Sequence, residues 1–275
     1  MPHLTAGSVD EALAALRGGA RIVAGGTDFF PALGERPVTF PVVDVTRAEG
    51  LRGISEDAAA LRIGAATTWT DIVRAPLPPA FDGLKAAARE IGSIQIQNTG
   101  TIAGNLCNAS PAADGVPCLL ALDASVELAS ARGRRVLPLG TFVTGVRRTA
   151  LEPGEMMTAI TVPRPPAGAR GAFAKLGARR TLVISIAMCS AVVVPAADGT
   201  VAEARVAVGA CSPVARRLVA LEAALAGAPL ASMADRVAPE HLAPLAPIDD
   251  VRGTAAYRTE AVATMLRRLL AGLAR

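Results

Sequence analysis

The chain is poor in the side chains that most often build metal centres and nucleic-acid surfaces. Its 275 residues include only two histidines, His3 and His241, and aromatic residues make up 3% of the composition. With so few imidazoles, a metal site is not expected. The net charge of +4 comes mostly from scattered arginines, with no basic tract longer than pairs such as Arg147-Arg148. Nucleic-acid binding needs a clustered basic face or interleaved aromatics, so the sequence argues against that function.

Paired cysteines and long apolar runs are also missing. Cys107, Cys118, Cys189 and Cys211 form no Cys-x-x-Cys pair, which predicts reduced thiols of a cytoplasmic protein. The spacing of Cys107 and Cys118 fits neither an iron–sulfur ligand run nor a dithiol motif, so both are predicted to be buried structural thiols. The first residues lack the basic and apolar segments of a signal peptide. The longest apolar run, 182–194, is too short to cross a bilayer and predicts a buried strand.

The spacing of apolar residues outlines the elements. Strands are predicted at 21–23, 38–45, 61–63, 124–129, 134–139, 155–162, 183–194 and 203–209. Helices are predicted at 8–17, 81–91, 117–122, 213–226 and 254–273, with a short one from Thr68 that carries Trp69 as a core or interface residue. The alternating segment 92–99 is predicted to be extended. The Pro-rich stretch 163–168 is the clearest linker, so a domain boundary is placed there.

Two glycine-containing segments are the best candidates for a binding site. Residues 24–28 (AGGTD) follow a short strand, and residues 100–114 (GTIAGNLCNASPAAD) combine small residues with Asn, Ser-Pro and Asp. Both predict turns with unpaired backbone amides, and two such turns could hold a diphosphate between them. Neither contains the GxGxxG or Walker pattern. A plain turn is the alternative for 24–28.

Taken together, these segments resemble a known family. Five stretches match it: AGGTD at 24–28, IGSIQIQN at 91–98, TIAGN at 101–105, SPAAD at 110–114 and FAKLG at 173–177. The chain resembles the flavoprotein (medium) subunit of the xanthine dehydrogenase and carbon monoxide dehydrogenase family of molybdenum hydroxylases, along nearly its whole length. The resemblance implies an α+β fold with a two-subdomain, PCMH-type FAD-binding domain like that of vanillyl-alcohol oxidase. That domain would span 1–166, with subdomains at about 1–53 and 54–166, and a small α/β domain of the CO dehydrogenase flavoprotein type would span 170–275.

The same resemblance implies FAD as the cofactor and a set of residues around it. Those residues are Ile22, Val23, Ala24, Gly25, Gly26, Thr27, Asp28, Phe29, Ile91, Thr101, Ile102, Ala103, Gly104, Asn105, Asp114, Met157 and Lys175. Small residues would let backbone amides approach the diphosphate, while Thr101 and Asn105 would add side-chain hydrogen bonds. Asp114 would bind a polar group on the adenosine half. Some members carry an aromatic residue where this chain has Ile91, which argues against ring stacking from that side.

Several of these residues also have purely structural interpretations. Asp114 is placed to cap the helix at 117–122, and Lys175 to lie at a solvated strand end. Met157 and Ile91 are both compatible with ordinary core packing. These alternatives remain open at the level of sequence.

The sequence shows no acid–base pair, so the chemistry would be the cofactor's. The resemblance implies electron transfer to this FAD from the two [2Fe-2S] clusters of a small subunit, after hydroxylation at a molybdopterin-binding large subunit. The assembly would be an (αβγ)2 heterohexamer, with NAD⁺ or another acceptor receiving the electrons. A free-standing flavin-dependent oxidoreductase and a flavin-free interaction protein are the alternatives.

Overall fold

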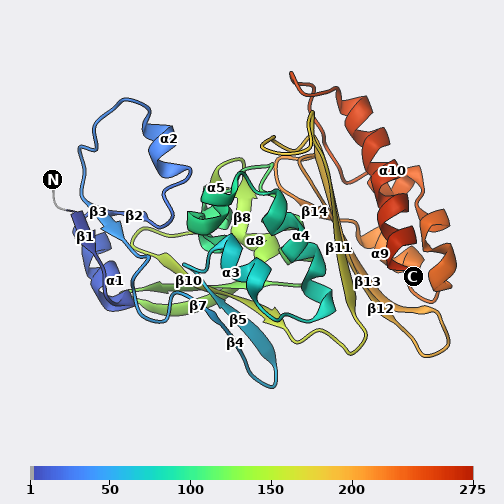
Figure 1. Ribbon diagram of the computed structural model, residues 1–275, viewed down its shortest axis with the longest axis horizontal. Coiled ribbons are helices and arrows are strands. Elements are labelled where there is room, and N and C mark those ends of the chain that lie inside the picture. Colours follow the sequence, from blue (N-terminus) through green and yellow to red (C-terminus); the bar gives the residue numbers. More distant parts are fainter. Residues whose placement is uncertain (1–2, 275) are drawn as a thin grey trace.

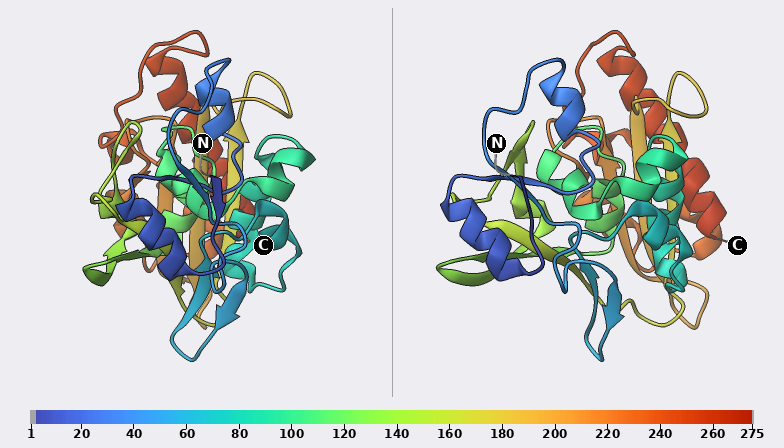
Figure 2. Two further views of the ribbon diagram at one scale, coloured as in Figure 1. Left: turned by 90° about the vertical axis from the view of Figure 1, so that its left-hand side faces the viewer. Right: turned by 60° about the vertical axis from the view of Figure 1, so that its left-hand side comes forward.

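The computed structural model describes residues 3–274, and its three larger sheets lie in a row along the long axis (Figure 1), beside a two-stranded sheet of β8 (Val143–Gly145) and β9 (Arg148–Thr149). The first is a parallel sheet of order β1-β3-β2, formed by β1 (His3–Thr5), β2 (Arg21–Val23) and β3 (Val42–Asp44). Helix α1 (Val9–Arg17) connects β1 to β2 and starts where the Ser8 hydroxyl accepts a bond from the Glu11 amide. This small sheet lies at one end of the molecule, and the C-terminal helix lies at the other (Figure 2).

The central sheet is antiparallel, with order β4-β5-β10-β6-β7. Its strands are β4 (Ile54–Glu56), β5 (Ala60–Gly64), β6 (Ser125–Ser130), β7 (Gly133–Pro138) and β10 (Met156–Pro163). Between β5 and β6 the chain forms α3 (Trp69–Arg74), α4 (Asp82–Glu90), α5 (Ile94–Thr99), α6 (Ile102–Asn108) and α7 (Gly115–Ala121). This group of helices lies between the central sheet and the C-terminal sheet (Figure 1).

The C-terminal sheet has order β11-β12-β13-β14, with strands Arg170–Leu176, Ala187–Pro195, Val201–Gly209 and Arg216–Arg217. Helices α4 and α7 pack on one face, and α9 (Val219–Leu225) and α10 (Ala255–Leu273) cover the other. Alternate β12 residues therefore enter different cores: Val192 packs into the core shared with the central sheet and its helices, whereas Ala191 and Val193 pack under α10. A strand covered on both faces reads as a continuous apolar run, which is what the sequence shows.

The remaining elements are short. They are α2 (Phe29–Leu33), α8 (Leu139–Phe142), β8 (Val143–Gly145), β9 (Arg148–Thr149), and the 3-10 turns Pro79–Phe81, Leu230–Arg236 and Pro239–Leu242. Among the helices of residues 3–274, none is long and apolar enough to span a membrane.

Several predicted elements differ from the structure. The segment 92–99 is not extended: Ser93 caps α5 by accepting a hydrogen bond from the Ile96 amide, and this local cap prevails over the Ile-Gln alternation. Residues 100–114 are mostly helical, not an open turn, because Thr101 caps α6 and α7 follows. Helix α7 also begins two residues before Pro117. The strand predicted at 183–194 starts only at Ala187, and the helix predicted at 213–226 is the β14 strand followed by α9.

Candidate functional site: a cavity between the glycine loop and α6

The glycine loop, residues 24–28, follows β2 and has free hydrogen-bond donors. Gly26 adopts φ 70°, a left-handed conformation that favours glycine. Within residues 3–274, none of the five amides from Ala24 to Asp28 donates a hydrogen bond to a protein acceptor. A run of unbonded amides in a turn forms a site for an anionic group.

This loop lies directly against the end of α5, where the chain leads into α6. A Cβ atom on Gly25 would overlap the carbonyl oxygen of Thr99, so only glycine permits this approach. On the other side of the loop, a Cβ atom on Gly26 would lie 2.6 Å from the ring of Phe30, which therefore covers the loop. The two glycine-containing segments of the sequence do meet in space.

The second segment differs from the expectation of unpaired amides. The Ile102 amide donates to the Thr67 carbonyl, and the Ala103 amide donates to Ala65. The Gly104 amide donates to the Thr101 hydroxyl oxygen at 3.1 Å, which is the capping bond of α6. The Asn105 amide donates to the Thr101 carbonyl. Because these amides already have acceptors, residues 102–105 do not supply the predicted second side of an amide clamp. The backbone donors come from the glycine loop, and α6 offers side chains.

Asn105 is the side chain of α6 with the clearest free polar atom. Its Oδ1 atom is buried and has no hydrogen-bond partner among the described residues. A buried polar atom without a partner costs free energy, on the order of 1–3 kcal/mol, so its position indicates a polar ligand group. Asn105 lies on the wall of the cavity described next.

A cavity of about 500 Å³ lies between the glycine loop and α6. Its volume is in the range of small-molecule and cofactor sites, roughly 300–1,000 Å³. All of the predicted cofactor-binding residues except Ile102, Asp114 and Lys175 line it. Sequence reasoning did not assign to the site the other lining residues, which are Val45, Ala65, Trp69, Ile96, Gly100, Cys107, Asn108, Leu151 and Met156. Ile91 and Met157 lie on this wall, and Met157 is also buried among core residues.

The three predicted residues outside the wall are buried elsewhere. Ile102 is fully buried in the core. Lys175 Nζ lies 2.7 Å from Asp114 Oδ2, and the Ser185 hydroxyl donates to Asp114 Oδ1 at 2.6 Å. Burial raises the pKa of the Asp114 carboxyl, while Lys175 and Ser185 act in the opposite direction. Asp114 makes no side-chain cap on α7, and the Lys175 side chain is only 8% exposed, so both structural alternatives from the sequence are wrong.

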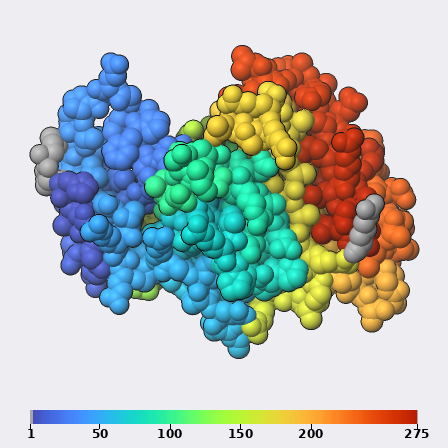
Figure 3. All heavy atoms as spheres, viewed as in Figure 1, coloured from blue at the N-terminus to red at the C-terminus, as the bar shows by residue number. Residues whose placement is uncertain are grey.

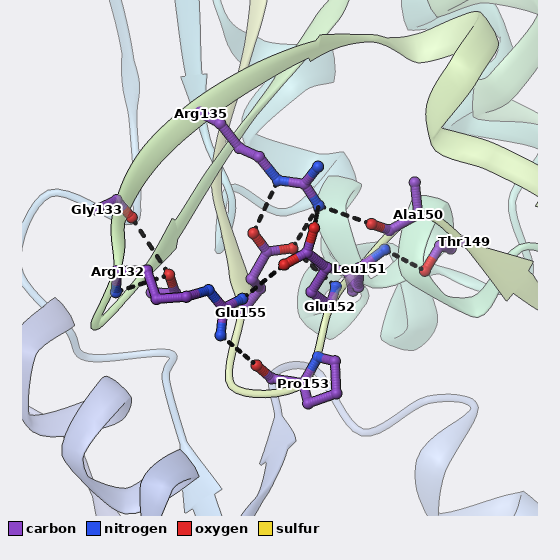
Figure 4. Close-up of polar contacts among 10 residues, drawn as sticks. Arg132, Gly133, Arg135, Thr149, Ala150, Leu151, Glu152, Pro153 and Glu155 are labelled. Carbon is purple, nitrogen blue, oxygen red and sulfur yellow. Dashed lines mark hydrogen bonds and ion pairs between the residues drawn. The ribbon is translucent and has the colours of Figure 1, made fainter.

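A second polar network holds the strand that carries Met156 and Met157. Arg135 donates to both oxygens of Glu155, at 2.8 and 2.7 Å, and to the Ala150 carbonyl (Figure 4). The Glu152 amide donates to Glu155 as well. The hydrogen bond from Arg135 lowers the pKa of the Glu155 carboxyl. No motif in the sequence indicates this network, because its members are separated along the chain.

The four cysteines are free thiols, as predicted. Cys118, Cys189 and Cys211 are buried, and burial raises the pKa of the Cys118 thiol to about 12. Cys107 is only partly buried and lies on the cavity wall, so the prediction of a buried thiol is wrong for this residue. Its thiol pKa is likewise raised to about 12. In residues 3–274, no cluster of three or more His, Cys, Asp or Glu side chains is arranged to hold a metal ion.

The fold and cavity define a class of protein that binds a diphosphate-containing cofactor between two sheet domains. The family described as "FAD binding domain in molybdopterin dehydrogenase" matches residues 3–165, and "CO dehydrogenase flavoprotein C-terminal domain" matches residues 172–273. The chain belongs to this family of molybdopterin dehydrogenase flavoproteins, and the resemblance found in the sequence is confirmed. Its cofactor is FAD.

Individual relatives agree with this assignment. The chain is 33% identical to the carbon monoxide dehydrogenase medium chain of Hydrogenophaga pseudoflava over 96% of its length and 93% of that protein. It is 40% identical to the nicotinate dehydrogenase FAD-subunit of Eubacterium barkeri over 60% of its length, and the match spans 57% of that relative. The structure of reconstituted CO dehydrogenase from Oligotropha carboxidovorans superposes with a TM-score of 0.91 at 30% identity, covering 98% of this chain and 96% of that one.

The residues of the cavity fit FAD. The glycine loop supplies unbonded amides for a diphosphate, and the unpartnered Asn105 oxygen supplies an acceptor for a hydroxyl or amino group. Ile91, Leu151 and Met157 supply apolar wall for a flat ring system.

Proposed function

We propose that this chain is the electron-transfer subunit of a multi-subunit molybdenum hydroxylase. It would receive electrons from the [2Fe-2S] clusters of a small subunit and pass them to NAD⁺ or another acceptor. Substrate hydroxylation would take place on a molybdopterin-binding large subunit, in an (αβγ)2 assembly. The free thiols support a reducing compartment, and we propose a cytoplasmic location.

One observation carries this proposal: the cavity wall has almost no ionisable side chains. Asp28 and Cys107 are the only ones that line it, and the Cys107 thiol has a pKa of about 12. A wall without a general acid or base suits a site where bound FAD accepts and releases electrons. The protein's own residues then bind the cofactor, orient it and limit access of water. A free-standing flavin-dependent oxidoreductase, the alternative from the sequence, would need an acid–base group at its substrate.

The assignment of individual FAD ligands is part of the proposal. We infer that the amides of residues 24–28 hold the diphosphate, with Thr101 and Asn105 adding side-chain hydrogen bonds. Asp114 and Lys175 pair with each other and lie outside the cavity wall. Their roles as cofactor ligands therefore stay predictions. The domain division at 1–166 and 170–275 is proposed on the same basis.

The decisive experiment is affinity purification of the tagged chain from its native host. We expect a yellow protein with bound FAD, accompanied by iron and molybdenum and by two further chains in mass spectrometry. A protein that carries FAD but brings no iron–sulfur chain would refute the electron-transfer role in favour of a free-standing flavoenzyme. A colourless protein would indicate the flavin-free alternative.

A further inference from the structure

Trp69, the only tryptophan of the chain, lies on the wall of the cofactor cavity. It is the first residue of α3 and is only 2% exposed. Two backbone contacts fix the start of α3 to the chain between α5 and α6. The Trp69 amide donates to the Gly100 carbonyl at 3.2 Å, and Thr68 forms an antiparallel β-bridge with Thr101. The indole ring is therefore held where the two glycine-containing segments of the sequence meet.

The two ends of the indole ring have different surroundings. A Cβ atom on Gly115 would lie 2.5 Å from Cη2 of the six-membered ring, so this end packs on α7, outside the cavity wall. A Cβ atom on Gly100 would lie 3.5 Å from Cδ1 of the five-membered ring and 3.5 Å from Thr27 Oγ1. The five-membered ring, which carries the N–H group, thus lies on the side of the glycine loop. In the space-filling view, the surface is hollowed between the blue N-terminal part, which contains this loop, and the green helices (Figure 3).

Among residues 3–274, none accepts a hydrogen bond from the indole N–H of Trp69. The Nε1 atom is nevertheless not one of the unpartnered atoms that lack accessible surface. Because Trp69 is almost fully buried and lines the cavity, the surface that Nε1 keeps faces the cavity. A buried tryptophan usually finds an acceptor for its N–H, and a donor left without one costs free energy. A ligand in the cavity would supply that acceptor.

We propose that Trp69 is a further ligand of the cofactor, whose indole N–H donates a hydrogen bond to a diphosphate oxygen of FAD. The position of the ring selects this group, because the ring lies beside Thr27 in the loop whose amides donate to no protein acceptor. A hydrogen bond to a charged oxygen is stronger than one between neutral groups. Core packing, the interpretation from the sequence, accounts only for the six-membered ring. The inference rests on the part of the proposed function that places the diphosphate at the glycine loop, and it is independent of the electron donor and acceptor.

The test removes the N–H group and keeps the shape of the ring. Because the chain has a single tryptophan, expression in a tryptophan auxotroph places an analogue at this position alone. In benzothienylalanine a sulfur atom replaces the N–H, so the donor is lost while the packing on Gly115 is kept. 5-Fluorotryptophan is the matched control, since it keeps the N–H and its fluorine is not on Cη2, the ring atom that contacts Gly115.

Both analogue proteins are titrated with FAD as the full-length apoprotein. We expect the benzothienyl protein to bind FAD about tenfold or more weakly than the unmodified chain, and the fluorotryptophan protein to bind it within about twofold. An NMR spectrum provides a readout that a purely structural role would not move. The single tryptophan gives a single indole N–H signal, and we expect this proton to shift downfield and to exchange more slowly with water when FAD binds.

Equal FAD affinity of the two analogue proteins would overturn the inference, as would an indole signal that FAD leaves in place. A benzothienyl apoprotein that is less stable to urea but binds FAD as tightly as the control would also overturn it, by assigning the ring to packing alone. In each of these cases FAD still binds, so the proposed function is untouched. If the unmodified apoprotein binds no FAD, the proposed function itself fails.

Discussion

At the scale of single residues, the closest packing in the site is between Gly25 and Thr99. There is no space for a Cβ atom on Gly25, since it would overlap the Thr99 carbonyl oxygen. We therefore predict that Gly25→Ala separates the glycine loop from the end of α5 and weakens FAD binding by about tenfold or more, equivalent to roughly 1.4 kcal/mol. The measurement is flavin content after dialysis, or titration of the apoprotein with FAD.

Gly272→Ala is the matched control for this substitution. Gly272 lies in α10, and no atom comes within 4 Å of the position that a Cβ would occupy. Alanine should be neutral or stabilising there, by up to about 1 kcal/mol. Equal FAD affinity in Gly25→Ala and Gly272→Ala would show that the approach of the loop to the end of α5 does not govern binding.

Cys107 is expected to be an unreactive thiol despite its place on the cavity wall. Burial raises its pKa to about 12, so at pH 8 only about one molecule in ten thousand carries the thiolate, the reactive form. We predict that maleimide leaves Cys107 unmodified over hours at pH 7–8, in the presence or absence of FAD. Peptide mass spectrometry checks this. Rapid labelling of Cys107 in the folded protein would contradict the assignment of a protonated thiol.

The glycine loop at residues 24–28 is the part of the site that could be predicted from the sequence. A glycine pair after a strand reports local backbone geometry, and the loop at 24–28 indeed has φ 70° at Gly26 and unbonded amides. Residues such as Trp69, Leu151 and Met156 carry no such local signal. They reach the cavity because α3 and β10 pack against α6 or near it, which depends on contacts between distant parts of the chain.

At the scale of elements, local helix caps explain why the predictions for residues 92–105 were wrong. The alternating Ile-Gln pattern of 94–97 favours a strand, yet Ser93 and Thr101 each cap a short helix. The Gly104 amide is used in the cap of α6. The amides of Ile102 and Ala103 donate to the carbonyls of Thr67 and Ala65. Those carbonyl partners lie more than thirty positions away, so their arrival could not be inferred from the motif.

The β10 strand provides an element-scale prediction with a pH dependence. Arg135 lowers the pKa of Glu155 below its ordinary value of 4.5, so the folded state favours the carboxylate. This stabilisation is complete above pH 4.5 and disappears as the pH falls through the lower pKa of the folded state. We predict that Glu155→Gln lowers the free energy of unfolding at pH 7, and that the deficit shrinks progressively below pH 4.5. Urea unfolding at several pH values measures it.

Glu152→Gln is the control for Glu155→Gln. Glu152 is 53% exposed and pairs with the exposed Arg132 and, at a longer 3.6 Å, with Arg135, whereas the Glu155 side chain is 4% exposed. Exposed ion pairs contribute little, so Glu152→Gln should change stability by less than about 1 kcal/mol. A deficit for Glu155→Gln that stays constant from pH 7 to pH 3 would rule out the Arg135 pair as its source.

At the scale of the whole molecule, the two cores are joined through β12 and through the pair of Asp114 and Lys175. The family resemblance of the sequence predicted both domains, because its matching motifs are spread from residue 24 to residue 177. It did not indicate how the domains are joined. Asp114 precedes α7 and Lys175 lies on β11, so their contact exists only when the C-terminal sheet is packed on α4 and α7.

This contact gives a prediction that separates a structural role from cofactor binding. Lys175→Met leaves the Asp114 carboxylate buried without its cation, which typically costs about 3–5 kcal/mol. We expect this loss in the apoprotein, measured by urea unfolding, and a partial recovery when Asp114→Asn is added, because Asn can still accept the Ser185 hydroxyl. Lys85→Met, at the chain's other lysine, is the control. If Lys175→Met leaves the apoprotein as stable as before and lowers only FAD affinity, the pair serves the cofactor and does not hold the two domains together.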